Sequence, residues 1–107
     1  MARLTPAEAR ERTDAEAVLL DVREAEAWAA GHAPGAVHVP LSGLVAGAPL
    51  PPAAAGRPLV VICRSGRRSR EAAALLTARG LDVVDVVGGM TAWHAAGFAV
   101  TAEGNAG

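Results

Sequence analysis

Several features are scarce or absent in this sequence, and they limit the compartment, the membrane association and the kind of core that can be expected. Lysine and tyrosine are absent, and there are only one cysteine, one phenylalanine and two tryptophans. A single cysteine cannot form a disulfide within the chain, so nothing points to an oxidising compartment. No apolar run approaches membrane-spanning length, and residues 1–6 lack the apolar core of a signal peptide. We therefore expect a cytoplasmic protein without a membrane partner, whose core is built from alanine, valine and leucine.

Charge is balanced over the whole chain but concentrated within it. Ten arginines and eleven acidic residues give a formal net charge of −1. A chain this close to neutral lacks the broad positive surface that nucleic-acid binding requires, so we expect no nucleic-acid partner. Four arginines nevertheless fall between positions 64 and 70: Arg64, Arg67, Arg68 and Arg70. The length allows one domain, residues 1–107, of which we expect 101–107 to be frayed.

The single cysteine lies where a strand is expected to give way to a helix. Residues 59–62 form a short, mostly β-branched apolar run after Pro58, which predicts a buried strand. Residues 71–80 are strong helix formers that end at Gly80, a typical helix stop. Cys63 therefore belongs to the loop that leads from the sheet into the helix.

Such a junction favours a reactive thiolate. The first backbone N–H groups of a helix have no carbonyl partners, and the helix dipole adds a partial positive charge at the same end. The thiolate is the reactive form of cysteine, and its pKa falls near a helix N-terminus and near arginines. Gly66 permits the positive φ with which successive amides turn inward around an anion. We therefore predict that Cys63 is a nucleophile, ionised near neutral pH.

Residues 63–69, with the sequence CRSGRRS, resemble the active-site loop of rhodanese-homology domains. Three further stretches are similar to the same family and occur in its usual order: LDVRE at 20–24, GHAPGAVHVP at 31–40 and GGMTAW at 88–93. Together the four motifs cover nearly the whole chain. The chain therefore resembles a single-domain rhodanese.

The resemblance implies a three-layer α/β/α fold, with a mainly parallel central sheet of about five strands and helices on both faces. The residue pattern itself alternates between strand and helix, which favours parallel strands joined by right-handed crossovers. Strands are expected at 16–22, 36–39, 59–62 and 81–87, and residues 98–100 are expected to close an edge.

Helices are expected at 6–13, 24–30, 71–80 and 90–96. The first should begin with Thr5 as its cap, Pro6 in its first position and Glu8 completing a capping box. One further helical turn is expected at 41–46, with Ser42 as its candidate cap. The stretch 47–56, rich in proline and alanine, is interpreted as a surface connection with a short helix in its alanines.

By the same resemblance, the reaction is the transfer of a sulfane sulfur atom. The Cys63 thiolate would attack the outer sulfur of thiosulfate or of another persulfide, forming a Cys63 persulfide and releasing sulfite or a thiol. A thiol or cyanide then takes the sulfur, and no cofactor is needed. The resemblance assigns substrate binding to the rest of the loop: Arg64, Ser65, Gly66, Arg67, Arg68 and Ser69.

Within this loop, Arg64 and Arg68 match basic residues that the family often carries after the nucleophile and at the end of the loop. Both are candidate anchors for a small anionic donor. Arg67 and Arg70 are expected to face solvent and to raise the local concentration of anions. Ser65 departs from the best-known thiosulfate-using rhodaneses, which have a second basic residue there. The sequence leaves the donor open between thiosulfate and another persulfide.

Two other functions are also open from the sequence. The same loop chemistry suits a persulfide carrier or binding module that serves one protein partner, such as a sulfur-relay protein. Related loops bind oxyanions in cysteine-dependent phosphatases and arsenate reductases, but they need an arginine six positions after the cysteine, where this chain has Ser69. The shorter loop should enclose a smaller guest, such as one sulfur atom, which makes this alternative the weaker one.

Outside the loop, Asp21 and Arg23 are expected to support the site. A carboxylate inside the apolar run 16–22 is costly unless it is paired, and Arg23 or nearby backbone amides are its closest candidates. We interpret Asp21 as part of a structural salt bridge or turn cap rather than as a catalytic acid. The spacing of the histidines matches no zinc pattern, so we expect no metal and interpret them as structural or surface residues: His32, His38 and His94.

Overall fold

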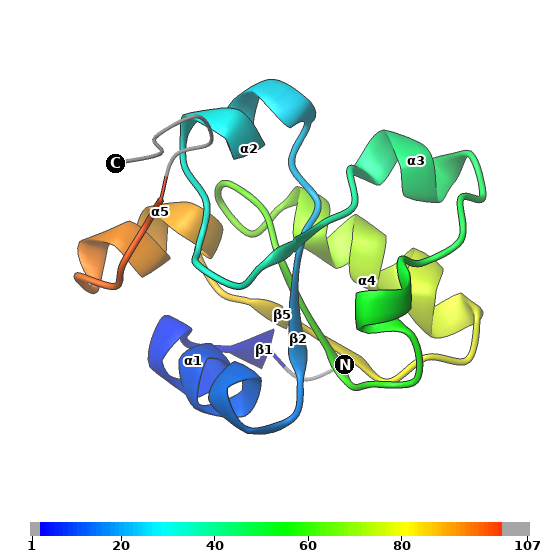
Figure 1. The fold of residues 1–107 in the computed structure, drawn as a ribbon, viewed down its shortest axis with the longest axis horizontal. Helices are drawn as coiled ribbons and strands as arrows, with labels where there is room; N and C mark the ends of the chain where they lie inside the picture. Colours follow the sequence, from blue (N-terminus) through cyan, green and yellow to red (C-terminus); the bar gives the residue numbers. More distant parts are fainter. Residues whose placement is uncertain (1–2, 102–107) are drawn as a thin grey trace.

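The computed structural model describes residues 3–101 and places five strands in one sheet (Figure 1). The strands are β1 (Arg3–Leu4), β2 (Val18–Asp21), β3 (Val37–His38), β4 (Leu59–Ile62) and β5 (Val83–Val86). Their order is β1-β5-β4-β2-β3, and every neighbouring pair is parallel. β4 therefore lies at the centre, and all carboxyl ends meet at one edge of the sheet, where open α/β folds bind their ligands.

Helices cover both faces of this sheet, which confirms the predicted three-layer α/β/α fold. They are α1 (Pro6–Ala15), α2 (Ala25–Ala30), α3 (Leu41–Val45), α4 (Arg68–Ala78) and α5 (Gly89–Ala95), with a 3-10 helix η1 (Pro52–Ala54). α1 and α5 bury apolar residues against one face of the sheet, and α3, η1 and α4 bury theirs against the other. Among residues 3–101, no helix is both long and apolar enough to cross a membrane.

The start of α1 follows directly from its sequence. The Thr5 hydroxyl accepts a hydrogen bond from the Glu8 amide at 3.2 Å, and the Glu8 carboxylate accepts one from the Thr5 amide at 2.9 Å. Pro6 occupies the first helical position. The predicted capping box is therefore confirmed, and the helix continues two residues beyond the predicted end, to Ala15.

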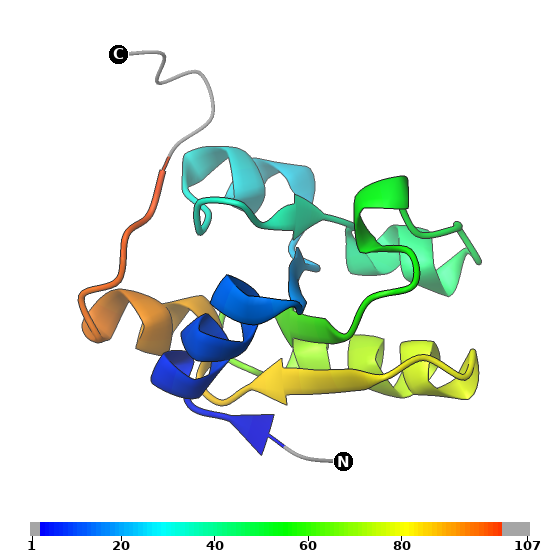
Figure 2. The same cartoon turned by 60° about the horizontal axis from the view of Figure 1, so that its bottom comes forward.

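The edges of the sheet differ from the prediction. The strand beside β5 is β1, which the sequence did not predict and which Figure 2 shows at the edge of the sheet. A strand of two residues is too short to show an alternating pattern. Residues 98–100, predicted to close an edge, form no strand, and Thr101 instead makes an isolated antiparallel bridge with His32. Of the predicted frayed end, residues 102–107 lie outside the described residues.

Two helix predictions are also corrected. α4 begins at Arg68, three residues before the predicted start, so that its first turn belongs to the arginine-rich segment. Ser42 does not cap α3, because Pro40 is the N-cap and the Ser42 hydroxyl instead donates to the Glu24 carboxylate at 2.8 Å. The short helix expected in 47–56 is confirmed as η1.

Candidate active site

The loop of residues 63–67 connects the centre of the sheet to a helix. Cys63 follows the last residue of β4, and α4 begins five residues later at Arg68. Cys63 therefore lies at the carboxyl edge of the sheet, as predicted, and it is 1% exposed. A buried thiol among apolar groups is inert, so the polar groups around Cys63 determine its chemistry.

A backbone amide of the loop points at the sulfur. The Gly66 N–H donates to Cys63 Sγ at 3.1 Å. Gly66 has a φ of +93°, in the region that favours glycine, which confirms the predicted conformation. A Cβ at this position would lie 3.0 Å from both Arg3 Nη2 and the Gly88 nitrogen. The loop thus closes around Sγ only with glycine at position 66.

The surroundings of Cys63 lower its pKa. Burial has the largest single effect and raises the pKa, because it disfavours the charged thiolate. Hydrogen bonding from Ser69 and from the Gly66 and Ser65 amides opposes burial and, taken together, outweighs it. The pKa of Cys63 therefore lies below its ordinary value, and the thiolate is more populated at neutral pH. The direction is the one predicted, and hydrogen bonding to the sulfur is what brings it about.

The motif at 88–93 fixes the loop from one side. The Met90 amide donates to the Cys63 carbonyl at 2.7 Å, and both the amide and the hydroxyl of Thr91 donate to the Arg64 carbonyl, at 2.9 and 3.0 Å. A Cβ on Gly89 would collide with the Cys63 carbonyl oxygen. Only glycine lets α5 approach so closely. The first two carbonyls of the loop are therefore held by α5, away from the sulfur.

Cys63 contributes to the lining of a cavity of about 440 Å³. The rest of its lining consists of four arginines, residues at the start of α2, and Ser65: Arg23, Arg64, Arg67, Arg68, Glu24, Glu26, Ala27 and Ser65. Arg64, Arg67 and Arg68 are exposed, and none of them forms an ion pair within residues 3–101. These three guanidinium groups are therefore available to an anionic substrate. Arg70 is also exposed but does not line this cavity.

Asp21 and Arg23 form the predicted salt bridge. Arg23 Nη2 lies 2.7 Å from Asp21 Oδ2, and the Arg23 amide donates to Asp21 Oδ1 at 3.0 Å. Arg23 also donates to the Gly31 carbonyl at 2.6 Å. Asp21 is fully buried and engaged in these bonds, and it holds Arg23 in the lining of the cavity. His32 and His38, interpreted as structural, donate hydrogen bonds from Nδ1 and Nε2 to the Trp28 and Arg23 carbonyls.

Two charged residues near the loop, Arg3 and Asp85, were not predicted from the sequence. The hydroxyl of Ser69, which is fully buried, donates to Asp85 Oδ2 at 3.2 Å. Asp85 is 1% exposed and pairs with Arg3 at 3.0 Å. Asp85 could have been found from its place in the apolar run 81–87, because a carboxylate in such a run needs a partner. The same argument identified Asp21.

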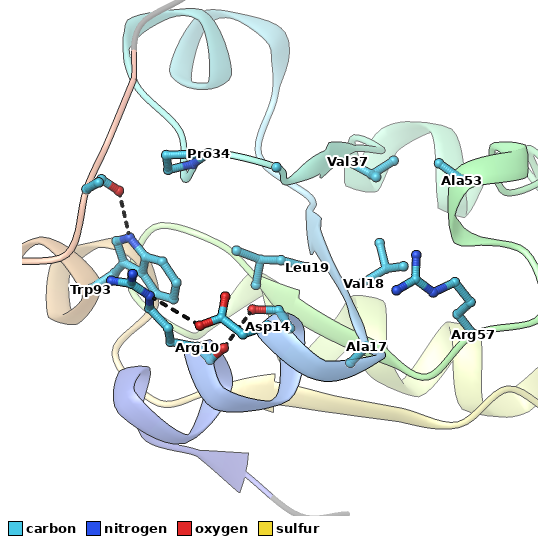
Figure 3. A pocket seen from close by; sticks show the side chains of 13 residues that line it. Arg10, Asp14, Ala17, Val18, Leu19, Pro34, Val37, Ala53, Arg57 and Trp93 are labelled. Atoms are coloured by element: carbon cyan, nitrogen blue, oxygen red, sulfur yellow. Dashed lines mark hydrogen bonds and ion pairs between the residues drawn. The ribbon is translucent and has the colours of Figure 1, made fainter.

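A second cavity lies at the opposite end of the sheet (Figure 3). It also measures about 440 Å³, and residues that precede or begin β2, β3 and β4 contribute to its lining. Its charged groups have partners: Arg10 lies 3.8 Å from Asp14, and Arg57 Nε donates to the Glu16 carbonyl at 2.9 Å. The Trp93 indole donates to the Ala99 carbonyl. The lining contains no cysteine or histidine, so this cavity offers no comparable nucleophile.

Comparison with known proteins agrees with the chemistry of the Cys63 loop. Residues 5–96 match the model of the rhodanese-like domain family. The thiosulfate sulfurtransferase GlpE of Pseudomonas putida strain GB-1 is 39% identical over 109 residues, covering 97% of this chain and 94% of that protein.

Solved structures share the fold. A rhodanese-related protein from Thermoplasma volcanium superimposes with a TM-score of 0.81 at 29% identity, covering 96% of this chain and all of that one. A protein of unknown function from Rhodopseudomonas palustris, described as a possible tyrosine phosphatase, gives a TM-score of 0.79 at 28% identity, covering 94% and 85% of the two chains.

Proposed function

The chain belongs to the rhodanese-like domain family, and on that basis we propose that it is a thiosulfate sulfurtransferase whose nucleophile is Cys63. The Cys63 thiolate attacks the outer sulfur of thiosulfate and forms a new S–S bond. The S–S bond of thiosulfate breaks, and sulfite leaves with the bonding electron pair. The product is a Cys63 persulfide, from which cyanide or a thiol takes the outer sulfur in the second half of the reaction.

The main support for this proposal is the hydrogen bond from the Gly66 amide to Cys63 Sγ, at 3.1 Å. The loop that contains it is held in place by bonds from α5 to its first two carbonyls. The amides are in place before substrate arrives, so no reorganisation is needed as negative charge shifts to the outer sulfur. The persulfide is itself an anion and is stabilised by the same donors.

The loop arginines supply the binding of the donor. Arg64 and Arg68 border the cavity at Cys63 and carry no competing ion pair within the described part of the chain. They would hold the sulfonate oxygens of thiosulfate, while Arg67 and Arg70 raise the local concentration of anions. Ser65 adds no charge, so the two anchors do more of the binding.

The acceptor is a small thiol or cyanide, or the cysteine of a sulfur-relay protein. A cavity that opens onto exposed arginines admits either kind of acceptor. If small acceptors react slowly, the same persulfide serves as a carrier for one protein partner. We place the reaction in the cytoplasm, because a lone thiolate nucleophile has to remain reduced.

A phosphatase or arsenate reductase is not favoured. At the position where such a loop needs an arginine, this chain has Ser69, which is buried and donates to Asp85. A buried hydroxyl turned toward a carboxylate does not bind a phosphoryl group.

The test is turnover with thiosulfate and cyanide, followed as thiocyanate formation. We expect saturable turnover by the wild-type chain, none by Cys63→Ser, and unchanged turnover by Arg57→Ala, which alters the opposite end of the sheet. Thiocyanate formation by Cys63→Ser would contradict the nucleophile assignment. Absence of turnover in the wild type, together with rapid sulfur transfer to a protein thiol, would favour the carrier function.

A further inference from the structure

Arg3 lies directly opposite Asp85 in the sheet. The two residues are register partners of the parallel pair β1 and β5, so their side chains emerge on the same face. Arg3 Nε lies 3.1 and 3.2 Å from the two carboxylate oxygens of Asp85, and Nη2 lies 3.0 Å from Oδ2. The carboxylate is buried, whereas the Arg3 side chain is 35% exposed. The guanidinium is thus oriented by three contacts to a buried carboxylate.

The same guanidinium reaches the loop of Cys63. Arg3 Nη2 donates to the Gly66 carbonyl at 3.2 Å, and the amide of that same residue donates to Cys63 Sγ at 3.1 Å. One residue therefore separates the arginine from the sulfur. Arg3 and Gly88 both lie on the side of Gly66 from which a side chain would project, since an added Cβ would be 3.0 Å from an atom of each. Its carbonyl is held by Arg3, and its amide is held at the sulfur.

Asp85 has a second connection to the site. Its Oδ2 accepts a hydrogen bond from the Ser69 hydroxyl at 3.2 Å, in addition to the bond from Arg3. The Ser69 backbone amide helps to lower the pKa of Cys63, while its hydroxyl is engaged with Asp85. Both flanks of the sulfur, Gly66 and Ser69, are therefore tied to a single buried carboxylate. Nothing in the sulfur-transfer reaction itself requires a carboxylate at this position.

We propose that Arg3, oriented by Asp85, is a positioning residue for sulfur transfer: it holds the Gly66 carbonyl and thereby limits rotation of the Gly66 backbone, so that the Gly66 amide remains on Cys63 Sγ. Arg3 also brings a positive charge to the back of the loop. Hydrogen bonding to Asp85 raises the pKa of Arg3, and attraction to a negatively charged Cys63 raises it further. Arg3 therefore stays charged throughout the working pH range.

Other charged groups near the loop come from each element around it. Asp85 comes from β5, and the Asp21–Arg23 pair comes from the end of β2 and the residues after it. Arg64 and Arg67 come from the loop, Arg68 from the start of α4, and the carboxylates of Glu24 and Glu26, at the start of α2, line the cavity at Cys63. The Asp21–Arg23 pair is internally neutral, and the loop arginines are exposed to solvent, which screens them. Arg3 differs because it bonds directly to the residue that bonds to the sulfur.

A positioning role in sulfur transfer rests on the proposed function. The first test, however, measures only the reactivity of Cys63 and does not require sulfur transfer. The pH dependence of Cys63 alkylation by the neutral reagent iodoacetamide reports the thiolate directly. We expect Arg3→Met to slow alkylation near neutral pH about tenfold, by removing a nearby positive charge and loosening the Gly66 amide. Arg57→Met removes the same charge at the opposite end of the sheet and should leave the profile unchanged.

Steady-state transfer from thiosulfate to cyanide provides the second readout. Because Arg3 does not line the cavity at Cys63, its loss should lower kcat about tenfold and leave KM nearly unchanged. A merely structural role would lower the yield of folded protein without changing kcat per folded active site. Arg3→Lys keeps the charge but cannot form all the hydrogen bonds of the guanidinium. Compared with Arg3→Met, it should therefore bring the alkylation rate closer to the wild-type value than it brings kcat.

Arg3→Met leaves Asp85 buried without its cation, so the double variant Arg3→Met/Asp85→Asn is made alongside it. The double variant removes both charges and still lacks a donor to the Gly66 carbonyl, so the loss of kcat should persist. Wild-type alkylation and wild-type kcat in the folded single variant, or wild-type kcat in the double variant, would overturn the proposal. Lack of sulfur transfer by the wild-type chain would instead refute the proposed function and leave the alkylation comparison valid.

Discussion

Two cavities of about 440 Å³ lie at opposite ends of the same sheet, and only one of them has the chemistry of an active site. At the amino end, charged side chains pair with each other or with carbonyls, as Arg10 does with Asp14 and Arg57 with Glu16. At the carboxyl end, a buried sulfur faces a backbone amide and exposed arginines without ion-pair partners in the described chain. Cavity volume alone therefore does not identify an active site. What distinguishes the carboxyl end is a nucleophile surrounded by hydrogen-bond donors and by arginines without ion-pair partners.

The largest expected difference between the two ends comes from removing the nucleophile. Cys63→Ser should lower sulfur transfer by at least about a thousandfold, because a serine hydroxyl is not ionised at neutral pH and forms no persulfide. Its size is close to that of cysteine, so thermal unfolding should change little. Arg57→Ala, at the amino-end cavity, is the matched control. Activity retained in Cys63→Ser would contradict the assignment of the active site to the carboxyl-end cavity.

The next effect comes from the glycine that closes the loop. Gly66→Ala should reduce the free energy of unfolding by roughly 2 kcal/mol and activity more than tenfold, because a Cβ at φ +93° would press on Arg3 and Gly88. Denaturant unfolding and turnover are measured together.

Gly47→Ala provides the control for backbone strain alone. Gly47 has a φ of +85°, and a Cβ there would meet no atom within 4 Å. Its substitution should cost about 1 kcal/mol and leave activity unchanged. Equal losses of stability and activity in the two variants would show that the contacts around Gly66 do not matter.

A smaller effect is expected at the arginines that line the cavity. Arg64→Ala should raise the KM for thiosulfate about fivefold with little change in kcat, because an exposed guanidinium binds the donor before and during the reaction alike. The effect should shrink as salt increases. Initial rates at low and high ionic strength measure the change in KM and its dependence on salt. An unchanged KM at low salt would show that Arg64 does not bind the donor.

The smallest effect is a dependence of stability on pH. Because the pKa of Cys63 is lower in the folded chain than in the unfolded chain, ionisation of the thiol stabilises the fold. This contribution is fully present above the unfolded pKa of about 8.5 and is lost as pH falls through the folded pKa. Unfolding free energies of the wild type and Cys63→Ser, compared across this range, should diverge as pH rises. A constant difference would contradict the lowered pKa.

The sequence predicted those parts of the site whose residues lie close together along the chain. The strand, the loop and the helix around Cys63 are consecutive, and their residue types indicate the junction locally. Asp21 and Arg23 are two positions apart, and the carboxylate in an apolar run required a neighbour. The start of α4 was placed too late because Arg68 and Ser69 were assigned to the loop, whereas Ser69 is held in the helix and bonded to Asp85.

The rest of the site depends on contacts across the sheet. Arg3 and Asp85 are 82 positions apart and meet only because β1 adds beside β5. No local pattern predicts a two-residue edge strand, and a single arginine near the N-terminus gives no hint of its partner. The close approach of Gly89 to the Cys63 carbonyl is likewise set by how α5 docks, although the GGMTAW motif marked the segment.

The central claim is that the Cys63 thiolate accepts a sulfur atom and that the loop holds it there. The intact mass of the protein after treatment with thiosulfate and desalting tests this claim most directly. The account predicts a gain of one sulfur atom that cyanide removes and that Cys63→Ser does not acquire. A gain that survives cyanide would indicate oxidation to the sulfinic acid, and no gain with thiosulfate or with a small persulfide donor would contradict the account.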